Sequence, residues 1–280
     1  MIIIGAPRSG TNMLRDVLCS LPGIDTWPCD EINYIWRHGN VRYPSDEFTP
    51  EMARPKVRKY IRGQFDWVAR KYRSESVVEK TCANSLRVGF VDQVLPDAKY
   101  IFIRRNGFDA IGSIIKRWKA SVDLAYLARK ARFVPLSDLP YYAGRYFYNR
   151  AYKLLSTEKS LAFWGPRFDA MQELARKYSL EELCALQWKK CVDRALDVLE
   201  KMPQHRFIKV EYEDFVHDPE EQLGHLSDWL GISLGPKALK HAVADVSAHS
   251  VGKGYRQLDD SLIDRLSPLI RDTQKRCGYE

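Results

Sequence analysis

Short apolar runs alternate along the chain with segments whose apolar residues recur at helical spacing. Ile2–Ile4 is a β-branched run that ends at a Gly/Pro turn, and Thr11–Leu21 then carries an apolar residue every three or four positions. Three later pairs repeat this order more loosely: Ser76–Glu79 before Ser85–Leu95, Lys99–Arg104 before Gly107–Trp118, and Phe207–Glu211 before a helix that Pro219 opens. Strands that alternate with helices predict a parallel sheet with helices on both faces.

The strand signal disappears between about residues 121 and 178, where aromatic and basic side chains dominate. We expect a mostly helical insertion there on the α/β core. No fixed-period repeat, low-complexity segment or Pro/Ser linker divides residues 1–280, so the sequence predicts a single domain. The expected fold class is therefore α/β with three layers: a central parallel sheet, helices on each of its faces, and the helical insertion.

The composition is that of a globular chain with a moderate basic excess. Of 280 residues, 45% are hydrophobic and 29% are charged, which excludes a disordered, collagen-like or disulfide-stapled chain. Lysine and arginine number 44 and acidic residues 36, which gives a formal net charge of +8. This balance favours a polyanionic ligand, of which nucleic acid is only one candidate.

Cysteine spacing favours a reducing compartment, and hydropathy favours a chain without a signal peptide or membrane span. Six cysteines lie far apart, with no C-x-x-C pair and no metal-ligand spacing to the six histidines, so we expect reduced thiols, no metal site and a cytoplasmic location. Ile2–Ile4 is too short for the apolar region of a signal peptide, and no stretch approaches the ~20 apolar residues of a membrane span. The sequence predicts a soluble protein with no integral membrane segment, unless an anchor was removed from its start.

The turn after the first predicted strand has the composition of a phosphate-binding loop. Gly5-Ala-Pro-Arg-Ser-Gly10-Thr11-Asn12 lies between a strand and a helix, where backbone N–H groups and the positive helix end can surround an anion. Its glycines have the G-x-x-x-x-G spacing, but Thr11 and Asn12 stand where an ATP-binding Walker motif has Lys and Ser or Thr. Arg8 supplies a cation inside the loop instead. The alternative interpretation is a tight turn that uses Gly and Pro for geometry alone.

Two segments together resemble a known family. Pro7–Asn12 resembles the 5′-phosphosulfate loop of sulfotransferases, which have a P-loop NTPase-like fold and use 3′-phosphoadenosine 5′-phosphosulfate (PAPS) as donor. Tyr100–Ser113 is similar to the family's 3′-phosphate segment, in which an Arg ends a strand and a Ser follows on the next helix. The resemblance implies two sets of donor-binding residues: Arg8, Ser9, Gly10, Thr11 and Asn12 at the 5′ end, and Arg105 and Ser113 at the 3′-phosphate.

Two further segments extend this resemblance over most of the chain. Phe207–Glu220 looks like the late strand and helix of the family, which implies that Tyr212 lies near the nucleotide. Ser250–Arg256 resembles the C-terminal glycine and basic loop that closes over the 3′-phosphate. Lys253 and Gly254 are therefore further donor-binding candidates, and Arg256 is a second candidate cation. Other members place Arg and Trp in this loop, where this chain has Lys and Tyr.

The resemblance also implies catalytic residues. Sulfuryl transfer resembles phosphoryl transfer, because the moving group passes between two oxygens through a loose transition state and charge neutralisation supports the reaction. Arg8 is the first candidate to balance charge on the leaving phosphate, and Lys80 lies in a Glu-Lys-Thr element similar to that of carbohydrate sulfotransferases. The acceptor hydroxyl also needs a base. Glu31 resembles the catalytic glutamate of the tyrosine-sulfating branch, and Asp30 and His38 are the other candidates.

The acceptor is suggested by the helical insertion. Phe163–Arg167 looks like a segment of bacterial sulfotransferases associated with polysaccharide or glycolipid acceptors, so we expect a carbohydrate or glycolipid hydroxyl, although core packing explains the same aromatic residues. One competing function is a nucleoside or small-molecule kinase, which needs Mg²⁺ and a Walker lysine that this loop lacks. The other is nucleic-acid binding, which no zinc spacing, RNP-like strand or recognition helix supports, so we expect no nucleic-acid partner.

Overall fold

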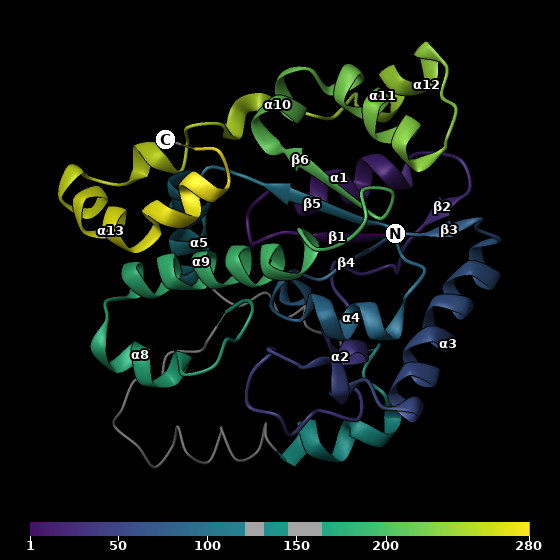
Figure 1. Cartoon of the computed structure of the whole chain (residues 1–280), viewed down its shortest axis with the longest axis horizontal. Coiled ribbons are helices and arrows are strands. Elements are labelled where there is room, and N and C mark those ends of the chain that lie inside the picture. The colour runs from purple at the N-terminus through teal and green to yellow at the C-terminus, as the bar shows by residue number, and fades with distance from the viewer. Residues whose placement is uncertain (121–131, 145–163, 280) are drawn as a thin grey trace.

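A four-stranded parallel sheet forms the centre of the computed structural model, which describes residues 1–120, 132–144 and 164–279 (Figure 1). In spatial order its strands are β4 (Glu79–Lys80), β1 (Ile2–Ile4), β5 (Tyr100–Arg104) and β6 (Phe207–Glu211). A smaller parallel pair consists of β2 (Ile24–Asp25) and β3 (Ser76–Val77), and only Val78 separates β3 from β4. All the strands of the central sheet are parallel, so the loops that follow them meet at one edge.

Alternating side chains of β1 and β5 enter two separate hydrophobic cores. Ile2 pairs with Tyr100 and Ile4 with Phe102, and these residues belong to the core on one face. Ile3 and Ile103 belong to the core on the other face, as the two-residue period of a strand requires. This division produces the three layers.

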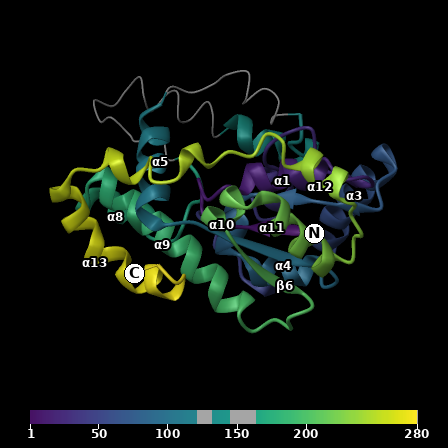
Figure 2. The same cartoon turned by 90° about the horizontal axis from the view of Figure 1, so that it is seen from above.

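Helices cover both faces of the sheet. The core that contains Ile2 includes residues of α2 (Asn33–Trp36), α3 (Pro55–Tyr72), α4 (Val88–Val94), α5 (Gly107–Lys119), α8 (Met171–Lys177), α9 (Leu180–Leu199) and α13 (Asp260–Arg276). The core that contains Ile3 includes residues of α1 (Thr11–Cys19), α10 (Tyr212–His217), α11 (Pro219–Leu230) and α12 (Pro236–Ala242). Figure 2 shows α5, α8, α9 and α13 gathered at one end of the molecule and α3 and α12 at the other. The predicted α/β class with helices on both faces is confirmed.

Short 3₁₀ helices connect several of these elements. They are η1 (Pro50–Met52), η2 (Cys82–Leu86), η3 (Leu136–Asp138), η4 (Ala248–Ser250) and η5 (Tyr255–Gln257). The helix predicted over Ser85–Leu95 is divided into η2 and α4, because Arg87 between them has a non-helical backbone (φ −143°, ψ 35°). Its guanidinium Nε donates back to the Asn84 side chain at 2.9 Å, which favours the break.

Part of the predicted insertion falls within the described residues. Over 132–144 and 164–178 these residues include η3 and α8 and form no strand. Residues 121–131 and 145–163, including Phe163 of the predicted acceptor segment, lie outside the described residues. The single-domain assignment of residues 1–280 stays a prediction.

Candidate active site

The loop from β1 to α1 packs tightly against the end of β6. Gly10, the last residue before α1, has φ +89°, and a Cβ atom built there would lie 2.3 Å from a ring carbon of Tyr212. A side chain at this position would therefore clash as well as strain the backbone. Ser9 and Thr11 are buried beside it, whereas Arg8, which also has a positive φ of 69°, and Asn12 are exposed. The loop presents its Arg8 side chain and the N-terminal end of α1 on the same edge of the sheet.

Arg8 and Arg105 join this loop to the turn after β5. The guanidinium Nε of Arg8 donates to the Ser113 hydroxyl on α5 at 2.9 Å. Arg105 is buried and donates to the backbone carbonyl of Arg8 at 3.1 Å and to that of Ser250. Its guanidinium also lies 4.3 Å from the centre of the Tyr212 ring. The structure therefore brings together four residues that the sequence assigned to donor binding.

The C-terminal loop, Ser250–Arg256, is held at the start of α5 by the carboxylate of Asp109. Asp109 is buried and accepts hydrogen bonds from the backbone N–H groups of Gly252 at 2.6 Å and Tyr255 at 2.8 Å. A Cβ atom on Gly254 would lie 2.0 Å from the Asp109 carbonyl oxygen, so only glycine permits this close approach. These contacts hold Lys253 beside α5.

A cavity of about 310 Å³, which we call the cationic cavity, lies between α5, the C-terminal loop and the phosphate loop. Its lining residues are Arg8, Arg105, Ser113, Lys116, Arg117, Ala120, Ser250, Lys253, Gly254 and Gln257. Five of these are cations and none is acidic. Partial burial lowers the pKa of Arg8, and the charges of Arg105 and Arg117 lower it further, partly offset by Cys82 and Tyr212. The cavity is therefore suited to a group with more than one negative charge.

The sequence analysis missed Lys116 and Arg117. They follow Ser113 by three and four residues, which places all three on one face of α5. That spacing was the signal that would have identified them. Arg256, by contrast, donates to the Val251 carbonyl at 3.4 Å. It lines neither the cationic cavity nor the larger cavity that adjoins it. Lys253 is therefore the cation of this loop that faces the cationic cavity.

A larger cavity of about 970 Å³, the central cavity, continues from the cationic cavity past the phosphate loop. Arg8, Arg105, Arg117 and Ser250 line both cavities. The central cavity is also lined by Gly10, Thr11, Asn12, Asp30, Glu31, Lys80, Cys82 and Tyr212. The candidate donor-binding and catalytic residues thus line two adjoining cavities at the carboxyl edge of the sheet, with the exception of Ser9, which is buried and lines neither.

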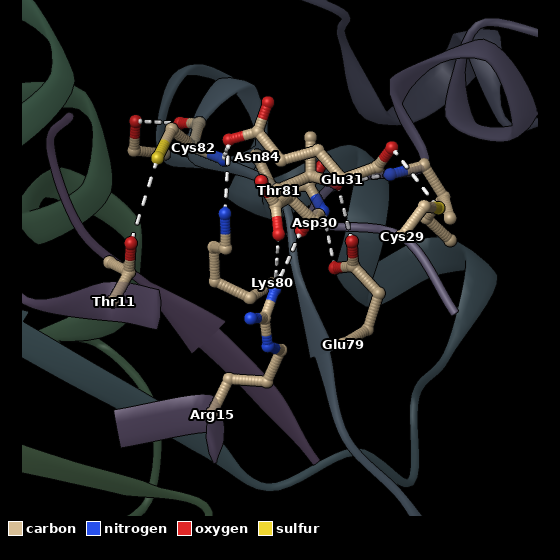
Figure 3. Close-up of polar contacts among 12 residues, drawn as sticks. Thr11, Arg15, Cys29, Asp30, Glu31, Glu79, Lys80, Thr81, Cys82 and Asn84 are labelled. Carbon is tan, nitrogen blue, oxygen red and sulfur yellow. Dashed lines mark hydrogen bonds and ion pairs between the residues drawn. The ribbon is translucent and has the colours of Figure 1, made fainter. Parts of the chain in front are cut away.

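Glu31 and Lys80 form an ion pair at the end of β4 (Figure 3). The ammonium Nζ lies 3.3 Å from Glu31 Oε1, and the same oxygen accepts from the backbone N–H of Cys82 at 3.2 Å. Burial by itself lowers the pKa of Lys80, but the attraction of Glu31 and Cys82 outweighs it and raises that pKa. Lys80 therefore remains a cation inside the cavity, with the Glu31 carboxylate as its partner.

The structure separates the two other base candidates. Asp30 lines the central cavity, and its carboxylate lies 3.4 Å from Arg15. His38 lines neither cavity, because its imidazole contacts Asp138 at 2.9 Å and packs against the Tyr60 ring at a centroid distance of 3.9 Å.

The central cavity is also lined by aromatic and basic residues, and by Asp46, which pairs with Arg37 at 2.8 Å. Tyr34 and Tyr142 lie edge to face with ring centroids 5.0 Å apart, and Trp164, Arg37 and Arg167 line the same region. Gln187 on α9 fixes the segment that carries Trp164 by donating to two of its backbone carbonyls at 2.9 Å each. The sequence analysis identified this segment but missed Tyr34 and Arg37, since one short helix turn gives no periodic signal.

Residues 1–120, 132–144 and 164–279 offer neither a metal-ligand cluster nor a membrane-spanning helix. No group of three or more His, Cys, Asp or Glu side chains is placed there to hold a metal ion. Within the same ranges, no helix combines the length and apolar character needed to cross a bilayer.

Comparison with known proteins assigns the family. The model of the sulfotransferase family matches residues 1–156 and 149–236. A search of curated protein sequences finds no match to the chain. Among solved structures, the sulfotransferase domain from the curacin biosynthetic pathway has a TM-score of 0.57 at 15% identity, over 100% of this chain and 97% of that one.

Two further structures have the same fold. The sulfotransferase domain of the Synechococcus PCC 7002 olefin synthase has a TM-score of 0.53 at 18% identity, over 100% of this chain and 94% of that one. Mouse sulfotransferase SULT7A1, whose structure is a complex with PAP, also has a TM-score of 0.53, at 14% identity and over 98% of this chain and 82% of that one. Because the family model spans most of the sequence, the chain belongs to the sulfotransferase family.

Proposed function

We propose that this sulfotransferase moves a sulfuryl group from PAPS to a hydroxyl acceptor, with Glu31 as the base. The observation that carries the proposal is the Glu31–Lys80 ion pair, which opens into the same cavity as the phosphate loop. A base and a buried cation thereby lie beside the place where an anionic donor would bind. Support for PAPS as the donor comes from the family and from a neighbour of the same fold that binds PAP.

The charges of the two cavities fit both ends of this donor. The five cations of the cationic cavity, without any acidic residue, suit the 3′-phosphate. The N-terminal end of α1 and the loop that carries Arg8 suit the 5′-phosphosulfate. Arg105 and Arg117 line both cavities, so they lie between the proposed sites for the 3′-phosphate and the 5′-phosphosulfate.

In the proposed reaction the acceptor oxygen forms a bond to sulfur while the bond from sulfur to the phosphate oxygen breaks. Glu31 takes the acceptor's proton, and the electron pair of the broken bond leaves with adenosine 3′,5′-bisphosphate. Protonation of Glu31 weakens its attraction for Lys80, 3.3 Å away. The charge of Lys80, together with that of Arg8, then becomes available to the leaving phosphate as its negative charge grows.

We further propose a carbohydrate or glycolipid as the acceptor. Tyr34, Tyr142 and Trp164 offer aromatic surfaces on which a sugar ring can stack, and Arg37 and Arg167 lie in the same region. The Tyr142 hydroxyl is buried without a hydrogen-bond partner among the described residues, so an acceptor hydroxyl would satisfy it.

Transfer of labelled sulfate from PAPS to a panel of sugars, glycolipids, phenols and peptides tests both levels of this proposal. We expect metal-independent transfer to a sugar hydroxyl in the presence of EDTA. Transfer to phenols or peptides alone would reject the carbohydrate acceptor and keep the reaction. Transfer of phosphate from ATP with Mg²⁺, or binding of generic DNA or RNA without any sulfate transfer, would reject the proposed function.

A further inference from the structure

The carboxylate of Glu79 is buried next to the proposed reaction centre but has no part in the chemistry described so far. It precedes Lys80 on β4 and is 1% exposed. Its two oxygens accept from different donors: Oε1 from the Thr81 hydroxyl at 2.5 Å, and Oε2 from the Asn84 side-chain amide at 2.9 Å. Thr81 and Asn84 are also fully buried, so water does not compete for these hydrogen bonds.

Arg87 determines which atoms donate and which accept in the hydrogen bonds that run from Arg87 through Asn84 to Glu79. A guanidinium only donates, so the contact of Arg87 Nε with Asn84 at 2.9 Å makes the Asn84 oxygen the acceptor. The amide nitrogen of Asn84 must then donate to Glu79, and Glu79 must accept. Burial raises the pKa of Glu79 to about 7, against the opposing effects of the Thr81 and Trp36 side chains and of the charges of Lys80 and Arg87.

A second hydrogen bond of Thr81 connects it to the segment that carries Glu31. Its hydroxyl has one proton, which is directed at Glu79, so the oxygen presents a lone pair to another donor. That donor is the backbone N–H of Ile32, at 3.2 Å. This hydrogen bond ties the residue after Glu31 to the residue after Lys80. Figure 3 shows Thr81 and Glu79 among the polar contacts around Lys80 and Glu31.

We propose that Glu79 and Thr81 are positioning residues, which hold the Glu31 carboxylate at Lys80 through the hydrogen bond from Ile32 N–H to Thr81. This inference rests on the proposed role of Glu31 as the base. Neither residue lines the two cavities, so both act through Glu31 and not on the donor or acceptor. Loss of the hydroxyl would leave the Ile32 N–H without its partner, so that the contacts of the Glu31 carboxylate with Lys80 and Cys82 would hold it at the end of β4 without this support.

Thr81→Val is the first test, since valine keeps the shape of threonine and removes only the hydroxyl. We expect kcat for sulfate transfer to fall about 10- to 100-fold, the cost of a small misplacement of a catalytic group. The affinity for adenosine 3′,5′-bisphosphate should stay unchanged, and hydrogen exchange at the Ile32 amide should become faster. Thr81→Ser keeps the hydroxyl and is the matched control, with kcat and Ile32 exchange near those of the wild type.

Glu79→Gln tests the other end of the chain of bonds. A glutamine side chain has one acceptor oxygen and one NH₂ donor, so it cannot accept from both Thr81 and Asn84. We expect Glu79→Gln to lower kcat, as Thr81→Val does. In the double mutant kcat should fall little further than in Thr81→Val alone, because both substitutions act through the hydrogen bond between Ile32 and Thr81.

Several results would overturn the proposal. Thr81→Val with the kcat and Ile32 exchange of Thr81→Ser removes the positioning role. A parallel loss of kcat, bisphosphate affinity and melting temperature in Thr81→Val, with the same losses in Thr81→Ser, identifies a purely structural residue. A wild-type protein that transfers no sulfate rejects the proposed function, whereas an active wild type with an unaffected Thr81→Val variant rejects the positioning role alone.

Discussion

Arg8 in the loop before α1 and Ser113 on α5 lie 105 residues apart in the sequence and form a direct hydrogen bond of 2.9 Å. The resemblance to sulfotransferases assigned these residues to opposite ends of the donor, Arg8 to the 5′-phosphosulfate and Ser113 to the 3′-phosphate. Arg105 strengthens the same connection through the Arg8 carbonyl. The two segments proposed to bind the donor phosphates are therefore directly connected, and a ligand with phosphates at both positions should stabilise this edge of the sheet.

Adenosine 3′,5′-bisphosphate should accordingly raise the melting temperature of the protein without any metal ion. A ligand that binds one site of the folded state only adds about 2.7 kcal/mol to the free energy of unfolding at about 100 times its Kd. Thermal melts with EDTA present measure this effect. ATP with Mg²⁺ is the control, and equal stabilisation by the two nucleotides would support the kinase alternative instead.

Lys116→Ala and Arg117→Ala should each weaken binding of the bisphosphate more than binding of adenosine 5′-monophosphate. Both side chains line the cationic cavity, and the monophosphate lacks the 3′-phosphate that they are expected to contact. A charge-assisted hydrogen bond of this kind contributes about 1.5 to 3 kcal/mol, less where water screens it. Parallel titrations of both nucleotides measure the difference.

Lys119→Ala is the matched control for these two variants. Lys119 lies on the same helix and carries the same charge, but it pairs with Glu181 at 3.0 Å and lines neither cavity. Arg105→Ala is a less selective probe, because its loss also leaves two backbone carbonyls without their donor. An equal loss for both nucleotides in Lys116→Ala and Arg117→Ala would exclude these residues from a 3′-phosphate site.

The sequence predicted the sheet and the phosphate loop because both depend on local patterns. The apolar run Ile2–Ile4 and the glycines of the following turn specify a strand, a tight loop and a helix within a few residues of each other. Parallel strands then bring every following loop to one edge, which places Arg8, Arg105 and Tyr212 close together, as the resemblance to sulfotransferases implied.

The remainder of the site depends on long-range contacts that no local pattern encodes. Tyr34 faces Tyr142 across more than a hundred residues, and the alternation of apolar residues carries no information about such a pair. His38 was a reasonable base candidate on proximity in sequence to Glu31. Asp138, which holds its imidazole away from the central cavity, comes from the region where the sequence predicted only an insertion.

The Cys82 thiol should resist alkylation although it lines the central cavity. Burial, with the nearby Glu31 carboxylate, raises its pKa from 9.0 to about 12, so the thiolate fraction at pH 8 falls roughly 1,000-fold below that of an ordinary thiol. Peptide mapping after iodoacetamide treatment at several pH values measures this reactivity. Glu31→Gln removes the carboxylate charge, so it should lower the pKa and speed the labelling of Cys82. Rapid labelling of the wild type at pH 8 would contradict the structure.

Glu31→Gln should also separate catalysis from donor binding. The amide preserves size but cannot accept the acceptor's proton, so kcat should fall about 10²- to 10⁴-fold. Bisphosphate affinity should not fall, because Glu31 is an anion paired with Lys80 and would not itself hold a phosphate. Asp30→Asn and His38→Asn serve as controls, measured by kcat and Kd under the same conditions. Near-normal turnover in Glu31→Gln would remove its role as base, and a collapse confined to Asp30→Asn would transfer that role to the other carboxylate of the cavity.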